Sequence, residues 1–109
     1  SLSTFCWQLI INNYLLNSDS QVFHWSDSGV ASWYDFAFSI GELGMKHGLI
    51  ERMADIRPIK SSDFPTAAKR PNFSLLDNSK SSSLIQKTPK HWREELSENL
   101  QILKFNLKI

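Results

Sequence analysis

The first stretch of the chain, residues 4–16, is apolar on nearly every side of the helix that its length and composition predict. Its apolar positions are Phe5, Cys6, Trp7, Leu9, Ile10, Ile11, Tyr14, Leu15 and Leu16. A helix that is apolar all round is normally buried all round. Either this helix lies at the centre of the core, or one of its faces is covered by an absent domain or a partner chain.

The second predicted helix begins at Ser32 and ends before Gly48. Ser32 and Asp35 have the spacing of a capping box, in which the hydroxyl and the carboxylate each accept a backbone amide proton at the helix start. Glycine is the preferred residue just past a helix C-terminus. The apolar face of this helix is expected at Trp33, Phe36, Ile40 and Leu43.

Two more helices are predicted near the C-terminus. Asp77 or Asn78 can cap a short helix that runs to about Gln86. Thr88 and Pro89 predict the start of the last helix, with threonine as the cap and proline in the first turn. The apolar face of this last helix is expected at Trp92, Leu96, Leu100, Leu103 and Leu107.

The segments between the helices predict two short strands and one long loop. Residues 22–25 are typical of a short strand closed by a turn at 26–29, after a polar turn at 17–20, and residues 49–57 are expected to be extended as the second strand. Residues 57–80 contain three prolines and no helical period, so they predict an extended surface loop. The expected fold is a small α/β domain with about four helices, two short strands and this long loop.

Size, charge and cysteine content narrow the class of protein. A chain of 109 residues is expected to form one domain, residues 1–109. Its net charge of +1 gives no electrostatic case for a nucleic acid or a membrane surface as partner. No apolar run approaches the roughly 20 residues that span a bilayer. The lone Cys6 is expected to be a buried structural thiol, which fits a reducing compartment, and the expected location is the cytoplasm.

Catalytic and metal-binding patterns were sought among the histidines, carboxylates and serines. His24, His47 and His91 lie far apart, and none has a Cys, Asp or Glu partner at metal-ligand spacing. No nucleophile elbow is present, and no pair of carboxylates has a local context that would shift a pKa. We therefore expect no catalytic residue and no metal site in this chain.

The long loop carries a recognisable signature. Its elements are Pro58-Ile59, Phe64-Pro65-Thr66, Arg70-Pro71, Ser74-Leu75-Leu76-Asp77 and Lys80. This pattern resembles the C-terminal substrate domain of the dTDP-4-dehydrorhamnose reductases, which are extended short-chain dehydrogenase/reductases. Ala67 departs from it, because the family more often has proline there.

Two further matches support the resemblance. One is Val22-Phe23-His24 followed by Gly29 and by Ser32-Trp33-Tyr34-Asp35-Phe36-Ala37; the other, weaker, is Trp92 with Leu96. Together the matches cover about residues 20–105 in the family's order. The resemblance implies the substrate-binding lobe of a two-lobe reductase, with a dTDP-sugar as ligand.

The resemblance also implies chemistry that this chain lacks. In the intact family NAD(P)H gives hydride to the 4-keto group of the dTDP-sugar, and an N-terminal Rossmann domain supplies the glycine-rich loop and a Tyr-x-x-x-Lys pair. Here Tyr14 is followed four residues later by Ser18, and Tyr34 by Phe38. We therefore expect no cofactor to be bound by this chain alone. The missing Rossmann domain, or a partner chain, is expected to dock through the first helix.

The cations of the loop are the best candidates for ligand binding. Lys69 and Arg70 stand beside a proline, and arginine binds phosphate with a planar, bidentate fork. The alternative is that Arg70 hydrogen-bonds loop carbonyls and holds the shape of the loop. Arg57 is a second candidate. Phe64 either contacts a ligand ring or fills a hydrophobic pocket under the loop, and His24 is either a packed residue or a substrate contact.

Two other functions compete with this interpretation. The chain can be a non-catalytic protein-interaction or regulatory module of the same fold, and the apolar first helix favours that reading because it predicts self-association. It can also be the specificity lobe of another extended dehydrogenase, such as an epimerase acting on a different nucleotide sugar. The Phe-Pro-Thr and Arg-Pro signature argues against this last reading.

Overall fold

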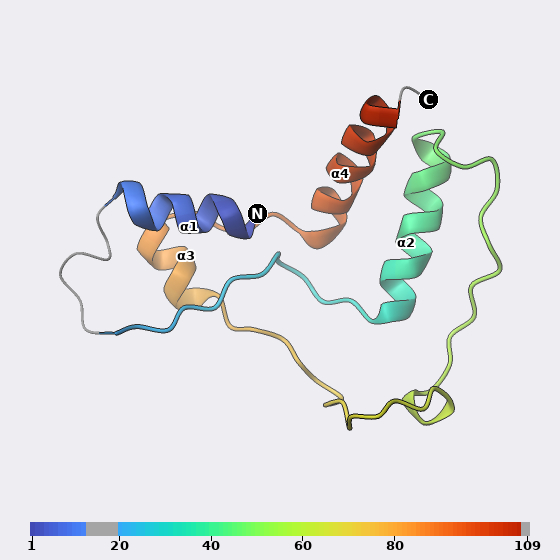
Figure 1. Cartoon of the computed structure of the whole chain (residues 1–109), viewed down its shortest axis with the longest axis horizontal. Coiled ribbons are helices and arrows are strands. Elements are labelled where there is room, and N and C mark those ends of the chain that lie inside the picture. The colour runs from blue at the N-terminus through green and yellow to red at the C-terminus, as the bar shows by residue number, and fades with distance from the viewer. Residues whose placement is uncertain (13–19, 108–109) are drawn as a thin grey trace. The chain divides into compact units, whose positions relative to one another are not determined.

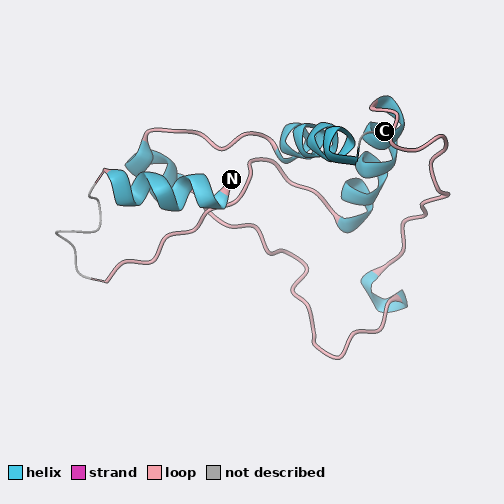
Figure 2. Cartoon of the chain, turned by 45° about the horizontal axis from the view of Figure 1, so that its top comes forward, coloured by secondary structure: helices cyan, strands magenta, loops and turns pink. Residues whose placement is uncertain are grey.

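A computed structural model describes residues 1–12 and 20–107 of the chain, which form four α-helices and one short 3-10 turn (Figures 1 and 2). The elements are α1 (Leu2–Ile11), α2 (Trp33–Lys46), η1 (Ser61–Asp63), α3 (Ser79–Ile85) and α4 (Trp92–Leu107). They belong to two compact units. Unit 1 comprises residues 1–28 and 74–91, and unit 2 comprises residues 29–73 and 92–109.

Unit 1 is built around the inward side of α1. Phe5 and Leu9, one turn apart, are its buried apolar residues, and Phe5 is only 4% exposed. The Phe5 ring stacks on Trp25 with a centroid distance of 4.6 Å, and it meets Phe23 edge to face at 6.2 Å. Aromatic pairs in these geometries add to the stabilisation from apolar burial. The segment that carries Phe23 and Trp25 is therefore held against α1 by ring packing.

Hydrogen bonds from α3 and from its N-cap residue Asn78 also hold this segment. Ser81, which is 1% exposed, donates its hydroxyl to the carbonyl of His24. Asn78 donates its side-chain amide to the carbonyl of Ser26 at 2.9 Å. These bonds satisfy two backbone carbonyls that lie outside any sheet.

Unit 2 begins with the capping box that the sequence predicts. The Ser32 hydroxyl accepts the Asp35 amide proton at 3.1 Å, and the Asp35 carboxylate accepts the Ser32 amide at 2.8 Å. At the other end of α2, His47 is the C-cap and Gly48 adopts φ +66°. Both ends of this helix therefore confirm the prediction.

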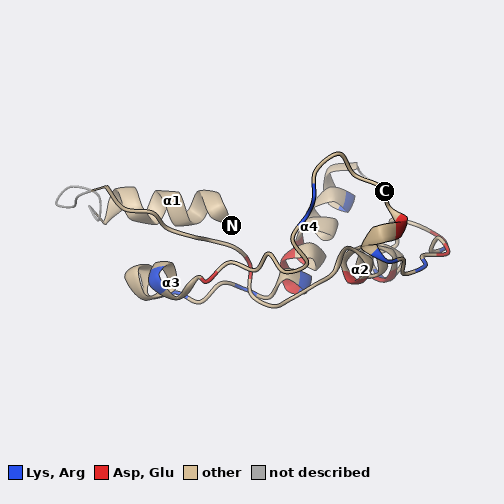
Figure 3. Ribbon diagram, turned by 90° about the horizontal axis from the view of Figure 1, so that it is seen from below, with Lys and Arg blue, Asp and Glu red and all other residues tan. Residues whose placement is uncertain are grey.

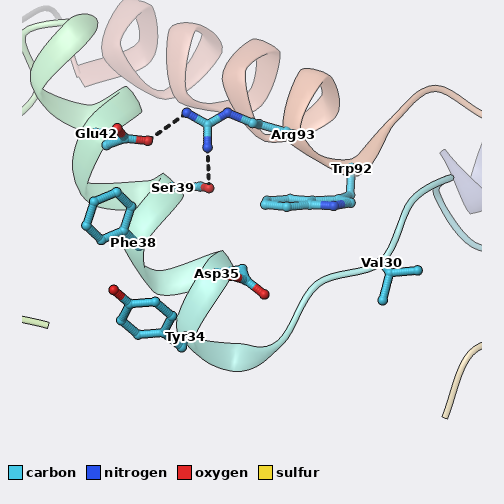
Figure 4. Close-up of a pocket in the computed structure, with 8 residues that line it drawn as sticks. All are labelled: Val30, Tyr34, Asp35, Phe38, Ser39, Glu42, Trp92 and Arg93. Carbon is cyan, nitrogen blue, oxygen red and sulfur yellow. Dashed lines mark hydrogen bonds and ion pairs between the residues drawn. The ribbon is translucent and has the colours of Figure 1, made fainter. Parts of the chain in front are cut away.

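A polar clasp joins α2 to α4 within unit 2. At one end, Arg93 donates to the Ser39 hydroxyl at 2.6 Å and to the Glu42 carboxylate at 2.7 Å. At the other end, Lys104 donates its ammonium to the carbonyl of His47, the last residue of the α2 cap, at 2.7 Å. Ser39 is 3% exposed, so its hydroxyl requires the partner that Arg93 provides. Figure 4 shows the Arg93 end of the clasp.

The two predicted strands are not present, and the α/β assignment is wrong on this point. Across residues 1–12 and 20–107, β pairing is limited to an isolated parallel bridge between Ser28 and His91. A strand is stable only where a neighbouring strand accepts and donates its backbone hydrogen bonds. In residues 22–25 the carbonyls of Val22 and His24 instead accept hydrogen bonds from the α3 side chains Lys80 and Ser81. Residues 49–57 have no neighbouring strand in the described chain.

The predicted start of the last helix is also wrong. We expected α4 to begin at Thr88 and Pro89, and it begins at Trp92. The carbonyl of Lys90 accepts the amide of Ser28 at 2.9 Å, and His91 forms the bridge to Ser28. The backbone before Trp92 is therefore extended and bonded to another segment.

The short helix α3 agrees with the prediction at both ends. Asp77 accepts the Ser79 amide at 2.9 Å, and Gln86 ends the helix with φ +51°. The first helix starts earlier than predicted, because the Ser1 hydroxyl accepts the Thr4 amide and caps it. The predicted extension of this helix through residues 13–16 lies outside the described residues, as does most of the turn at 17–20.

Predicted burial was right at some apolar positions and wrong at others. Cys6 is exposed, because Phe5 and Leu9 occupy the inward side of α1 and Cys6 lies on a different side of the helix. Of the apolar face predicted for α2, Leu43 is buried at 6% exposed, whereas Trp33 is 78% exposed. A domain this small buries only part of the surface of each helix, so some apolar side chains stay uncovered.

We expect Gly48→Ala to destabilise unit 2 by about 1 kcal/mol, because a Cβ disfavours the positive φ of this residue. Gly48→Asn is the matched control and should cost less, because asparagine tolerates the left-handed region. The measurement is amide hydrogen exchange along α2. Equal protection of the α2 amides in wild type and Gly48→Ala would contradict the predicted cost of the positive φ at Gly48.

We also expect Asp35 to make the stability of α2 depend on pH. The Ser32 hydroxyl, and then the Ser32 amide, lower the pKa of Asp35 below 3.8. A depressed carboxyl pKa contributes stability above the unfolded value, and this stability is lost as the pH falls through the folded pKa. Asp35→Asn should therefore lower helicity by circular dichroism above pH 3.8. The difference from wild type should shrink below that pH, and a difference independent of pH would contradict the account.

Candidate functional site

The long loop is exposed along its whole length from Arg57 to Asp77. Its hydrogen bonds are local: the Lys60 amide donates to Asp63 at 3.3 Å, and the Thr66 hydroxyl donates to the Ala68 carbonyl at 2.8 Å. The first bond helps to form the η1 turn. The prediction of an extended surface loop is confirmed, and its side chains are accessible to a ligand.

The structure places the cationic candidates on this exposed surface. Lys69 and Arg70 are both exposed, and Arg70 makes no hydrogen bond to a loop carbonyl among the described residues. The alternative in which Arg70 holds the shape of the loop is therefore not what the structure has. The Arg57 guanidinium already forms an ion pair with the Asp55 carboxylate, with 2.6 Å between Nη2 and Oδ2. Because this ion pair is 82% and 71% exposed, it contributes little to stability.

The two remaining candidates have different surroundings. Phe64 is 65% exposed, so it does not fill a hydrophobic pocket under the loop. His24 is exposed in unit 1, where its carbonyl accepts a hydrogen bond from the Ser81 hydroxyl. The roles of these five residues in ligand binding remain predictions.

A pocket that the sequence reasoning missed lies between α2 and the start of α4 in unit 2. Its volume is about 290 Å³, and we call it the aromatic–acidic pocket (Figure 4). It is lined by Val30, Tyr34, Asp35, Phe38, Ser39, Glu42, Trp92 and Arg93. The Tyr34 and Phe38 rings are neighbours with a centroid distance of 6.0 Å, and the Trp92 ring meets Phe36 edge to face at 6.1 Å.

Helical spacing is the signal that could have found half of this pocket. Tyr34, Phe38 and Glu42 follow one another at intervals of four, and so do Asp35 and Ser39. Residues at this spacing lie on one side of a helix. The other half of the pocket comes from α4, more than fifty residues later in the sequence. No local pattern predicts that the two helices meet.

Carboxylates outnumber cations in the aromatic–acidic pocket. Figure 3 shows acidic residues on α2 and at the start of α4. Two carboxylates, Asp35 and Glu42, face one guanidinium, Arg93, which is bonded to Glu42 and Ser39. The bonds from Ser32 hold the pKa of Asp35 below its usual value, so this group is charged at neutral pH.

The described residues also bear on metal binding and on membrane insertion. Over residues 1–12 and 20–107, no three His, Cys, Asp or Glu side chains gather in a way that could hold a metal ion. None of the helices that the structure describes is long and apolar enough to cross a membrane.

Comparison with known proteins identifies the family. The family model of the RmlD substrate binding domain matches residues 1–105. The chain is 32% identical over 75 residues to a dTDP-4-dehydrorhamnose reductase from Aggregatibacter actinomycetemcomitans, covering 69% of this chain and 26% of that protein. It is 31% identical over 84 residues to the spore coat polysaccharide biosynthesis protein SpsK of Bacillus subtilis (strain 168), covering 73% of this chain and 26% of that protein. No solved structure gave a significant match.

The chain therefore belongs to the RmlD substrate-binding-domain family, as the loop signature predicts. It spans about a quarter of the length of the two curated relatives. The match is to the substrate-binding domain of this family.

Proposed function

We propose that this chain is the nucleotide-sugar-binding lobe of a protein similar to dTDP-4-dehydrorhamnose reductase, acting in dTDP-rhamnose biosynthesis. The observation that carries the proposal is the family match over residues 1–105. Both curated relatives support it, since one is named for the dTDP-sugar reduction and the other for polysaccharide biosynthesis. The ligand is a dTDP-4-keto-6-deoxyhexose.

In this proposal Lys69 and Arg70 hold the diphosphate. Both side chains are exposed, and within residues 1–12 and 20–107 no loop carbonyl accepts a hydrogen bond from Arg70, whose guanidinium has five donors. A guanidinium fork matches the geometry of phosphate oxygens, and a lysine beside it adds a second positive charge. Arg57 is the weaker candidate because Asp55 already occupies its fork.

Phe64 in unit 2 and His24 in unit 1 are two further candidates, and each is proposed by itself. The Phe64 ring is exposed beside the cations in sequence, where it can pack on a flat base such as thymine. His24 has an exposed ring in unit 1, and imidazole can donate to a sugar hydroxyl.

The chain supplies binding in this proposal, and the hydride chemistry lies elsewhere. NAD(P)H, and the Tyr/Lys pair that assists hydride transfer in the family, belong to the Rossmann lobe of the intact reductase. The chain alone is therefore expected not to oxidise NADPH in the presence of a dTDP-4-keto sugar.

We expect dTDP to shift the amide NMR signals of residues 69–74 and to saturate. Arg70→Met should weaken dTDP binding by about tenfold or more, because hydrogen bonds to charged groups contribute about 1.5–3 kcal/mol. Arg52→Met is the matched control, since Arg52 is an exposed arginine outside the loop. It should bind dTDP as the wild type does.

Two results would count against the proposed site. Dispersed signals with no response to dTDP would mean that the chain by itself is not a nucleotide-sugar-binding lobe. Equal losses in Arg70→Met and Arg52→Met would mean that dTDP is attracted by overall charge and has no site on the loop.

A second candidate function is a protein-interaction module, and the outer side of α1 favours it. Trp7, Ile10 and Ile11 are 61%, 56% and 50% exposed, and Leu2 is 61% exposed. The helix carries no charged residue. An uncharged helix that exposes this many large apolar side chains is typical of a surface that binds another protein segment.

This candidate predicts that the chain self-associates through α1. Light scattering should show mass rising with concentration for the wild type, and the double variant Trp7→Gln/Ile11→Gln should stay monomeric. Trp33→Gln is the matched control, because it removes a single exposed tryptophan from α2 and should leave association unchanged. A wild type that is monomeric at every concentration would exclude α1 as a self-association surface.

A further inference from the structure

We propose that the aromatic–acidic pocket of unit 2 binds a small organic ammonium ion. Nothing in the proposed nucleotide-sugar function requires this pocket, and none of its residues is among the five predicted for the dTDP-sugar. The inference rests on three features of the pocket: its aromatic walls, its excess of carboxylates and its volume.

Three aromatic side chains, those of Tyr34, Phe38 and Trp92, line the pocket. In Figure 4 the rings of Tyr34 and Phe38 lie on one side, and the indole of Trp92 lies on the other. Aromatic faces carry a negative quadrupole, so they attract ammonium groups, and tryptophan does so most strongly. A ligand with methyl or methylene groups around a positive nitrogen also gains from leaving water.

The charges of the pocket select a cation over an anion. Asp35 and Glu42 supply two carboxylates, and Arg93 supplies the one guanidinium. Arg93 directs its fork at Ser39 and Glu42, which lowers its attraction for an incoming anion. The lining is left with one negative charge more than it has positive charges. A diphosphate would be repelled here, which separates this pocket from the Lys69–Arg70 site.

The volume limits the size of the ligand. Pockets that take drug-sized molecules measure roughly 300–1,000 Å³. At about 290 Å³ this pocket lies just below that range, so it suits an ion of a few carbon atoms. Choline has this size and charge and is the probe we would use.

The test is a titration of the whole chain with choline chloride, followed through the indole NMR signal of Trp92, which the variant Trp92→Phe assigns. Sodium chloride at the same concentration controls for ionic strength. The neutral carbon analogue of choline, dimethylbutanol, controls for shape. We expect a saturable shift with choline that is absent with sodium chloride and at least about tenfold weaker with dimethylbutanol.

Variants locate the site. Tyr34→Leu/Phe38→Leu keeps the pocket apolar and removes two of its rings, so it should weaken choline binding by about tenfold. Phe105→Leu is the matched control, because Phe105 is 83% exposed on α4 and does not line the pocket. Its affinity should equal that of the wild type.

Three results would overturn the proposal. The first is an indole signal that does not respond to choline. The second is equal affinity for choline and dimethylbutanol, which would make the pocket simply apolar. The third is an equal loss in Tyr34→Leu/Phe38→Leu and Phe105→Leu. Because dTDP is not part of this titration, failure here leaves the nucleotide-sugar proposal unaffected.

Discussion

Unit 2 depends on the polar clasp between α2 and α4 more than on apolar burial. Among the described residues the buried large apolar side chains are Phe5, Leu9 and Leu43, and only Leu43 belongs to unit 2. The Arg93 bond reaches the buried Ser39 hydroxyl, whose loss of a partner would cost about 1–3 kcal/mol. The neighbouring Glu42 contact is half-exposed and contributes less. The same clasp positions Arg93 and Trp92 across from Tyr34 and Phe38. The aromatic–acidic pocket therefore depends on the hydrogen bonds that join α2 to α4.

Unit 1 is held together by ring packing and by hydrogen bonds from side chains to backbone carbonyls. Phe5 and Trp25 stack, and α3 side chains satisfy carbonyls of the extended segment. The indole nitrogen of Trp25 is buried without a hydrogen-bond partner in the described part of the chain. Its burial offsets part of the gain from stacking. Together with the exposed outer side of α1, this suits a unit that gains stability by packing against further protein.

The features that could be predicted from the sequence are those set by neighbouring residues. The capping box at Ser32 and Asp35, the glycine after α2 and the end of α3 at Gln86 involve contacts within a few positions. The exposure of the long loop follows from its prolines and its lack of apolar period. The binding candidates on the loop came from a family signature, and the comparisons confirm the family but not the role of each residue.

The features that could not be predicted depend on residues distant in sequence. The strand at 22–25 failed because its carbonyls bond to α3 side chains, and α4 starts late because Lys90 bonds to Ser28. Cys6 is exposed because one neighbour covers one side of α1. The aromatic–acidic pocket requires the meeting of α2 and α4, which no local pattern specifies. Interactions between residues close in sequence thus allowed the helix ends to be predicted. Which helix faces are buried, and where the pocket forms, depends on contacts between residues distant in sequence.

The central proposal is that the exposed loop of this family member binds a nucleotide sugar. The most direct measurement is amide hydrogen exchange of residues 57–77, followed by mass spectrometry with and without dTDP-rhamnose. The account predicts slower exchange at residues 69–74 when the sugar nucleotide is present, with α2 and α4 unchanged. Exchange in the loop that stays the same at saturating ligand, in a chain whose helices are protected, would contradict it.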